Sequence, residues 1–362
     1  MATPTPRPVG SAPTPTPIRP AATPAKPKAS RLGAVQRGRL RVPLRHLFYG
    51  PEGIGKSSLA ADAPAPIFFD IEGGSPELDV ARYPFRDGDG GHVPANYDEV
   101  LAGIDDLMSA QHEYQTLVVD TIDSLEALIH IHVCKAASKA NIEAFGYGKG
   151  YKVALTAVRE LLNRLDALRS RGMSIVLIGH SWVKTFKNPE GEDFDRYQLC
   201  MHDLAAAQVK DWCDVVGFMR FDGGASKLQG DAAQAPRARG WSSGRRLIHL
   251  AREAAWDAKS RLSLPAEVEL AVASPWAPFA EARDVARDAT VESLISAVLA
   301  EVDRITAGDR SVGFVTAAGR ATSFSEVNAI IAKGDVGSLT RVLAGLKATS
   351  PVTATQETAN AT

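Results

Sequence analysis

The sequence has few cysteines and no long apolar run, and both shortages exclude classes of protein. Only Cys134, Cys200 and Cys213 occur among 362 residues, and no C-x-x-C pair is present. A disulfide framework or a structural zinc site is therefore not expected. No apolar stretch reaches the ~18 residues of a membrane-spanning helix, and the N-terminus has no apolar signal-peptide core. We expect a cytoplasmic protein that makes no membrane contact.

Acidic residues are missing from the first 45 positions. This segment carries nine Lys/Arg, no Asp/Glu and ten of the 22 prolines, whereas the rest of the chain holds 32 basic and 42 acidic residues, a net charge of −10. Such low-complexity composition cannot bury enough apolar area to offset the loss of chain entropy. We predict a disordered basic arm over 1–42 and a disordered tail over 351–362. The arm could bind nucleic acid non-specifically, or it could serve only as a solubilising tail.

Short apolar runs alternate with helix-like segments between these tails. Continuous apolar strands separated by helices indicate a mainly parallel sheet that helices cover on both faces. The sequence therefore predicts an α/β domain over 43–265. The expected strands are His46–Tyr49, Ile67–Asp70, Leu117–Asp120, Ser174–Gly179, Val215–Met219 and Arg246–Leu250.

The pattern changes in the last quarter of the chain. Apolar residues recur at helical spacing between Val291 and Ile305, and Thr290 is a plausible N-cap. Shorter helical segments follow near Ser325–Lys333 and Ser338–Lys347. We predict a linker over 266–289 and a small helical region over 290–350.

A glycine-rich segment after the first strand matches the pattern G-x-x-x-x-G-K-[ST]. Its glycines let backbone N–H groups turn toward an anion, and the helix that follows directs its positive end at the same place. Lys56 would reach the β- and γ-phosphates of a nucleotide, and Ser57 would bind Mg²⁺. The expected nucleotide-binding residues are Gly50, Pro51, Glu52, Gly53, Ile54, Gly55, Lys56, Ser57 and Ser58.

Two further strands end in carboxylates. Asp120 closes the apolar run LVVD, the layout of a Walker B strand, and would hold Mg²⁺ together with Ser57. Glu72 follows the run IFFD and could deprotonate an attacking water, with Asp70 as the second candidate for this base. The cofactors expected are therefore ATP and Mg²⁺.

The order of these motifs resembles the RecA-type ATPase core. The resemblance implies that Glu72 in FFDIEGG is the catalytic base, and Thr121 and Ser124 match the hydroxyl residues after the Walker B strand. It also implies that a polar residue at the end of the next strand senses the γ-phosphate. RecA has glutamine there, whereas this chain has His180.

More narrowly, residues 43–265 resemble the phage AAA-ATPase or Sak-type proteins, RecA-like ATPases of single-strand annealing and recombination. This resemblance rests on GPEGIGKSS, DIEGG, VVDTIDSLE, FGYGKGY, GHS, FDRYQL and DAKSRL. It implies a bacterial or phage-infected host cell. Related ring-forming ATPases, including DnaB-type helicases, place a Lys-x-Arg pair against the neighbouring subunit's nucleotide. Lys259 and Arg261 match that pair, so we expect catalysis in trans within a ring or filament of identical subunits.

Two segments combine cations with aromatic residues, as single-strand binding surfaces do. The first is FGYGKGYK, expected to be a loop, with Tyr147, Lys149, Tyr151 and Lys152. The second follows His180 and contains Lys184 and Lys187, although acidic residues nearby weaken a simple phosphate-binding role.

Together the residues and the resemblance predict a Mg-ATP-dependent ATPase that binds single-stranded DNA in recombination or annealing. A single-strand DNA-binding protein is a further candidate partner. The alternative is an ATP-switched, loader-like module that binds another protein and contacts DNA only indirectly. A replicative helicase motor is less favoured, because the chain shows no helicase-accessory domain.

Overall fold

The computed structural model describes residues 42–349, apart from 89–90, 190, 228–237, 289–290, 312, 316–320, 334–335. The predicted N-terminal arm, up to Arg41, and the predicted tail from Pro351 lie outside the described residues. No helix within the described part is both long and apolar enough to cross a membrane.

Ten strands of the described residues form one sheet, in the order β10-β8-β7-β1-β5-β4-β2-β3, with β6 paired to β5 and β9 paired to β7. Strands β7, β1, β5, β4, β2 and β3 run parallel, and β8 and β10 extend the sheet antiparallel. The strands of this sheet are β1 (Arg45–Gly50), β2 (Pro66–Asp70), β3 (Ala81–Arg82), β4 (Thr116–Asp120), β5 (Ser174–Phe186), β6 (Phe194–Leu199), β7 (Val215–Lys227), β8 (Ala238–His249), β9 (Lys259–Ser260) and β10 (Glu267–Glu269).

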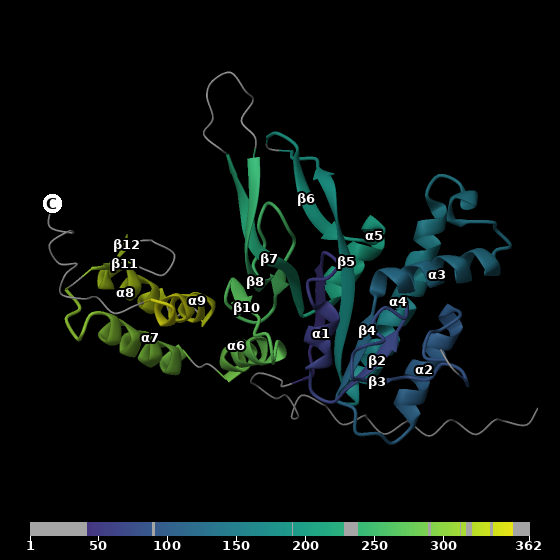
Figure 1. Cartoon of the computed structure of the whole chain (residues 1–362), viewed down its shortest axis with the longest axis horizontal. Helices are drawn as coiled ribbons and strands as arrows, with labels where there is room; N and C mark the ends of the chain where they lie inside the picture. The colour runs from purple at the N-terminus through teal and green to yellow at the C-terminus, as the bar shows by residue number, and fades with distance from the viewer. Residues whose placement is uncertain are drawn as a thin grey trace, which may run out of the picture. The chain divides into compact units, whose positions relative to one another are not determined.

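Helices cover both faces of this sheet (Figure 1). Alternate residues of β1 point to opposite faces, so Leu47 and Tyr49 enter one apolar core while Phe48 enters the other. The α/β fold with a mainly parallel sheet is therefore confirmed. The helices of this domain are α1 (Lys56–Ala61), α2 (Tyr97–Ser109), α3 (Ile122–Ala136), α4 (Lys149–Ser170), α5 (Asp203–Trp212) and α6 (Trp276–Asp288).

The strand order gives the core its RecA-like character. The strand with the glycine-rich loop, β1, and the strand ending in Asp120, β4, are not neighbours, because β5 lies between them. Gly50 pairs with His180, and Asp120 pairs with Ile178 on the other side of β5. The carboxyl ends of three adjacent parallel strands thus meet at one edge.

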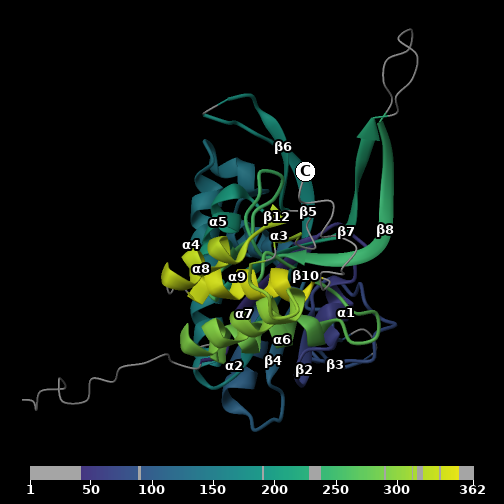
Figure 2. The ribbon, with the colours of Figure 1, turned by 90° about the vertical axis from the view of Figure 1, so that its left-hand side faces the viewer.

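Three strands are much longer than the apolar runs that predicted them. β5 continues past Gly179 and pairs with β6 as an antiparallel hairpin from Ser181 to Phe186. β7 and β8 also extend together as a long ribbon, which Figure 2 shows clearly. These extensions are rich in polar residues and glycine and are mostly exposed, which suits hairpins that lie outside the apolar core.

The predicted linker over 266–289 is wrong. This segment contains β10 and α6, and the side chains of Trp276 and Phe279 are buried against Phe48. Their spacing places both aromatic rings on one face of α6, so the helix belongs to the core of the α/β domain.

The C-terminal region has an apolar cluster of its own, formed by residues between Leu294 and Leu346. It comprises α7 (Val291–Ile305), α8 (Phe324–Lys333), α9 (Val336–Lys347) and a two-stranded sheet of β11 (Phe314–Val315) and β12 (Ala321–Thr322).

Candidate nucleotide site

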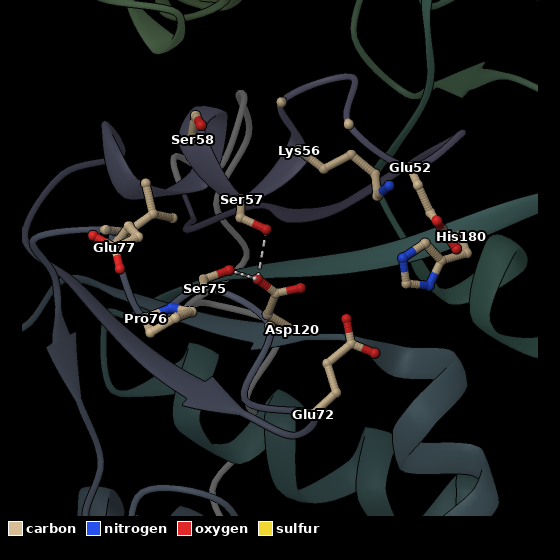
Figure 3. A pocket seen from close by; sticks show the side chains of 14 residues that line it. Glu52, Lys56, Ser57, Ser58, Glu72, Ser75, Pro76, Glu77, Asp120 and His180 are labelled. Carbon is tan, nitrogen blue, oxygen red and sulfur yellow. Dashed lines mark hydrogen bonds between the residues drawn. The ribbon is translucent and has the colours of Figure 1, made fainter.

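A pocket of about 390 Å³ lies where β1, β2 and β4 end and where β5 leaves the parallel part of the sheet at His180. Figure 3 shows Lys56, Glu72, Asp120 and His180 turned toward one another in it. The chain segments that form it are the glycine-rich loop, the segment after β2, the end of β4 and the middle of β5. Its lining residues are Glu52, Gly53, Gly55, Lys56, Ser57, Ser58, Glu72, Gly74, Ser75, Pro76, Glu77, Leu78, Asp120 and His180.

The glycine-rich loop has the backbone that its sequence requires. Gly53 and Gly55 have φ values of 72° and 96°, which favour glycine. Lys56 is 6% exposed, and its Nζ donates to the carbonyl oxygens of Gly50 (3.2 Å) and Pro51 (3.0 Å). Burial lowers the pKa of Lys56, while nearby carboxylates, Asp120 first among them, oppose that shift. Ile54, by contrast, is buried in the apolar core beneath the loop and does not line the pocket.

Asp120 and Ser57 form the centre of the pocket. Ser57 Oγ donates to Asp120 Oδ2 at 2.7 Å, and Ser75 Oγ approaches the same oxygen at 3.4 Å. Burial raises the pKa of Asp120, and the charges of Glu72 and Asp70 raise it further, while the bond from Ser57 lowers it. A cation would relieve this crowding of carboxylates. A hydroxyl and a carboxylate are oxygen donors suited to Mg²⁺, which keeps several other positions for water and phosphate.

Glu72 lies on the rim of the same pocket. Ser124 Oγ donates to Glu72 Oε2 at 2.8 Å, and Thr121 Oγ1 lies 3.5 Å from that oxygen. Asp70, the second candidate for the base, is 1% exposed and does not line the pocket. Its carboxylate instead accepts from Gly73 N at 2.8 Å. The geometry therefore favours Glu72 over Asp70.

His180 lines the pocket at the end where Lys56 and Glu52 lie (Figure 3). Its backbone N donates to Asp123 Oδ1 at 3.0 Å, and its ring Nδ1 lies 2.9 Å from Asp123 Oδ2. Asp123 belongs to the first turn of α3, directly after the Walker B strand. Sequence reasoning passed over Asp123, although it stands inside the quoted motif VVDTIDSLE.

Lys259 and Arg261 do not reach this pocket in their own chain. β9 pairs with the beginning of β7, which lies beside the beginning of β1, whereas the pocket lies where β1 ends. Lys259 Nζ donates to the carbonyl oxygen of Asp211 at 2.6 Å, and Arg261 donates to Asp214 Oδ1 at 3.1 Å. Catalysis by these two residues in trans stays a prediction.

The residues expected to bind DNA fall into two groups. Tyr147 is fully exposed, and Lys149 and Lys152 are also exposed. Lys149, Tyr151 and Lys152 are not in a loop as expected, because α4 begins at Lys149 after Gly148 in the left-handed conformation. The ring of Tyr151 stacks on His202 with centroids 3.8 Å apart, so one face of it is already covered.

The second group lies on the β5–β6 hairpin and is already ion-paired. Lys184 Nζ lies 2.7 Å from Asp203 Oδ2, and Lys187 pairs with Asp193. Asp193 belongs to the acidic segment that weakened this candidate, whereas Asp203 lies at the start of α5.

Arg246 is a cation near the glycine-rich loop that sequence reasoning did not connect with the nucleotide. A Cβ added at Gly55 would lie 2.5 Å from Arg246 Nη1, and Nη2 donates to the carbonyl oxygen of Ala271 at 3.1 Å. Only the pairing of β8 with β7 brings this residue to the loop, so local sequence carries no signal for it.

Comparison with known proteins bears on the family. Among solved structures, the flagellar accessory protein FlaH from Methanocaldococcus jannaschii is 10% identical, with 64% of this chain and 87% of that chain covered and a TM-score of 0.28. So low a score carries no argument about function. No curated protein matches the chain. A family model described as an AAA domain matches residues 43–262, more than half of the chain. The glycine-rich loop, Asp120 and strands β1 to β9 all lie within that match, and the chain belongs to this AAA domain family of P-loop ATPases.

Proposed function

We propose that this protein is a Mg-ATP-dependent, RecA-like ATPase that binds single-stranded DNA in phage-type homologous recombination or single-strand annealing. One observation carries the catalytic part of the proposal. Lys56, the Ser57–Asp120 pair and Glu72 share a single pocket at the carboxyl ends of parallel strands. Ligands of α/β sheets bind at this edge, where the strand order changes direction.

The residues of the pocket divide the chemistry of hydrolysis between them. Lys56 and the backbone N–H groups of its loop would bind the phosphates. Ser57 and Asp120 would hold Mg²⁺, which neutralises charge on the phosphate oxygens. Glu72 would accept a proton from the attacking water, and the bond from Ser124 fixes the direction of its carboxylate. His180 would contact the γ-phosphate.

Single-strand binding is supported by the exposed group at the start of α4. Tyr147 offers a free aromatic face, and Lys149 and Lys152 lie close to it in sequence, on the first turn of that helix. Base stacking and phosphate contact together are the usual means of sequence-independent binding. Lys184 and Lys187 would first have to exchange their carboxylate partners for phosphates.

The test is steady-state ATP hydrolysis with and without single-stranded DNA. We expect Lys56→Ala to lose hydrolysis by at least about a hundredfold, since it removes a phosphate contact strengthened in the transition state. Normal hydrolysis by Lys56→Ala would refute the assigned active site. A DNA arm uses the double variant Tyr147→Ala with Lys149→Ala, and Lys347→Ala, another exposed lysine, as control.

The DNA arm separates the two parts of the proposal. We expect the double variant to bind single-stranded DNA more weakly and with a smaller salt dependence, while its DNA-free hydrolysis and the control stay normal. Hydrolysis by a wild-type chain that neither binds DNA nor responds to it would refute the recombination role alone.

An ATP-switched protein-interaction module is the second candidate. The net charge of −10 after residue 45 and the paired lysines of the β5–β6 hairpin favour it. Purification from host cells distinguishes the two, because nucleic acid should accompany the first kind of protein and a stoichiometric protein partner the second.

A further inference from the structure

Asp123 holds His180 at two points. One carboxylate oxygen accepts the backbone N–H of His180 at 3.0 Å, and the other lies 2.9 Å from ring Nδ1. The side chains of Asp123 and His180 are 14% and 24% exposed, so the pair is largely shielded from water. The backbone contact fixes the position of β5 at His180, where the strand reaches the pocket. The ring contact fixes the rotation of the imidazole.

The carboxylate also determines which ring nitrogen is available to the pocket. An ionised carboxylate can only accept hydrogen bonds, so Nδ1 must carry the hydrogen of this contact. Nε2 is then the nitrogen left for a ligand. His180 lines the pocket together with Lys56 and Glu72, so Nε2 belongs to the group of polar atoms around the expected phosphates (Figure 3).

One helical turn sets the positions of three parts of the site. Asp120 ends β4, Thr121 caps α3, and Ser124 holds Glu72. Asp123 lies within the same turn and holds His180. The expected metal ligand, the expected base and the expected phosphate contact are therefore fixed relative to one another by residues 120–124.

We infer that Asp123 is a positioning residue, which presents Nε2 of His180 to the γ-phosphate and so lets the site distinguish ATP from ADP. The inference rests on the proposed function, because it assumes that the pocket binds ATP. Asp123 does not touch the nucleotide in this scheme; it acts only through His180. If Asp123 only held α3 against β5, its substitution would instead destabilise the whole domain.

A double-mutant cycle tests this dependence. It compares wild type, His180→Ala, Asp123→Asn and the double variant in the full chain, with kcat, KM and the affinities for fluorescent ATP and ADP analogues as readouts. Loss of one charge-assisted hydrogen bond should lower kcat and the preference for ATP over ADP by roughly ten- to a hundredfold. ADP affinity should stay unchanged. The double variant should match His180→Ala alone, because residues that act as a unit are not additive.

Asp98→Asn is the matched control. Asp98 Oδ1 lies 3.3 Å from Nδ1 of His132, a similar carboxylate–histidine contact outside the pocket. This variant should leave the ATP preference intact. Additive losses in the double variant, or equal losses of ATP and ADP affinity in Asp123→Asn, would overturn the inference.

Nitrogen-15 NMR of the wild-type histidines gives a readout that needs no activity and no substitution of Asp123. Assignment uses the resonance missing from His180→Ala. We expect hydrogen on Nδ1 of His180, and a neutral ring carrying hydrogen on Nε2 alone would refute the inference. An inactive wild type with the expected NMR signal would instead count against the proposed function only.

Discussion

At the scale of single residues, the buried carboxylates of this fold differ in their surroundings and in their roles. Asp120 is crowded by Glu72 and Asp70 in the pocket, where a cation would relieve the repulsion. Glu126, one turn beyond Asp123 on α3, is 7% exposed and accepts the backbone N–H of His202 at 3.0 Å. Burial raises the pKa of Glu126 to about 7, although the bond from His202 opposes the shift.

This raised pKa predicts how stability depends on pH. A carboxyl group whose pKa rises on folding stabilises the folded state fully below its unfolded value of 4.5, and this contribution is lost as pH rises through about 7. Glu126→Gln removes the ionisation. Relative to wild type, it should gain up to about 3 kcal/mol of unfolding free energy between pH 4.5 and pH 8.

Urea unfolding at several pH values measures the difference. The titratable groups near Glu126 are unchanged between the two proteins; they are His130, His202, Asp123, Cys200 and Tyr151. Glu143→Gln, which alters an exposed carboxylate that accepts from Tyr151, is the control and should show no such gain. A pH-independent difference for Glu126→Gln would contradict the expectation.

At the scale of elements, Asp214 joins the start of β1, the end of α4 and the residue after β9 at the sheet edge opposite the pocket. Arg45 of β1 donates to it at 2.8 Å, Arg261 at 3.1 Å, and Arg169 of α4 lies 3.5 Å away. Burial alone would raise the pKa of Asp214, but the bonds from Arg45 outweigh it and lower the pKa. This contribution to stability is therefore present above the unfolded value of 3.8 and is lost as pH falls below it.

Asp214→Asn should destabilise the domain at neutral pH. It leaves the guanidinium of Arg45, whose side chain is 11% exposed, without its principal counter-charge, and breaking such a buried pair costs about 3–5 kcal/mol. Thermal or urea unfolding measures the loss. Asp303→Asn removes the partner of Arg310 in an exposed pair and should change stability little. Equal effects of the two substitutions would mean that the cluster around Asp214 is no more than a surface network.

Some of the helices and strands could be predicted from the sequence, and others could not. Each apolar run gave a strand in the expected place, and the motifs at Lys56, Glu72 and Asp120 came together, because all three depend on local pattern and strand direction. α6 was missed because its aromatic residues pack against His46 and Phe48, more than 200 positions earlier. The start of α4 was missed because the stacking of Tyr151 on His202 is equally non-local.

At the scale of the whole molecule, the C-terminal region carries a core separate from those of the α/β domain. Every buried apolar residue of its cluster lies between Leu294 and Leu346, while α6 ends at Asp288. A chain ending at Asp288 should therefore fold, with ATP hydrolysis and the unfolding midpoint of the α/β domain unchanged.

A shorter chain ending at Ala273 is the contrasting truncation for calorimetry and hydrolysis. It loses Trp276 and Phe279 from the core, and removal of even one such ring costs about 3–5 kcal/mol. It should unfold or aggregate. Loss of folding in the longer chain as well would show that the helical region stabilises the α/β domain.

Catalysis in trans, if it occurs, requires an assembly of subunits. If Lys259 and Arg261 complete the site of a neighbouring subunit, hydrolysis per subunit should fall as dilution separates the subunits. Hydrolysis rates measured alongside sedimentation over a range of concentrations test this, with Lys347→Ala expected to follow wild type. A constant rate per subunit down to the monomeric range would exclude the arrangement.

One consequence follows from the unbroken course of β5. The strand reaches the pocket at His180 and continues without interruption to Trp182 and Lys184 in the hairpin. Alternation puts the three side chains on the same side of the strand, about 13 Å from first to last. Trp182 is 44% exposed, and Lys184 Nζ lies 5.9 Å from its ring centre. The intrinsic fluorescence of Trp182, two residues from His180, should therefore change when a nucleotide binds, so that binding can be followed without an attached dye.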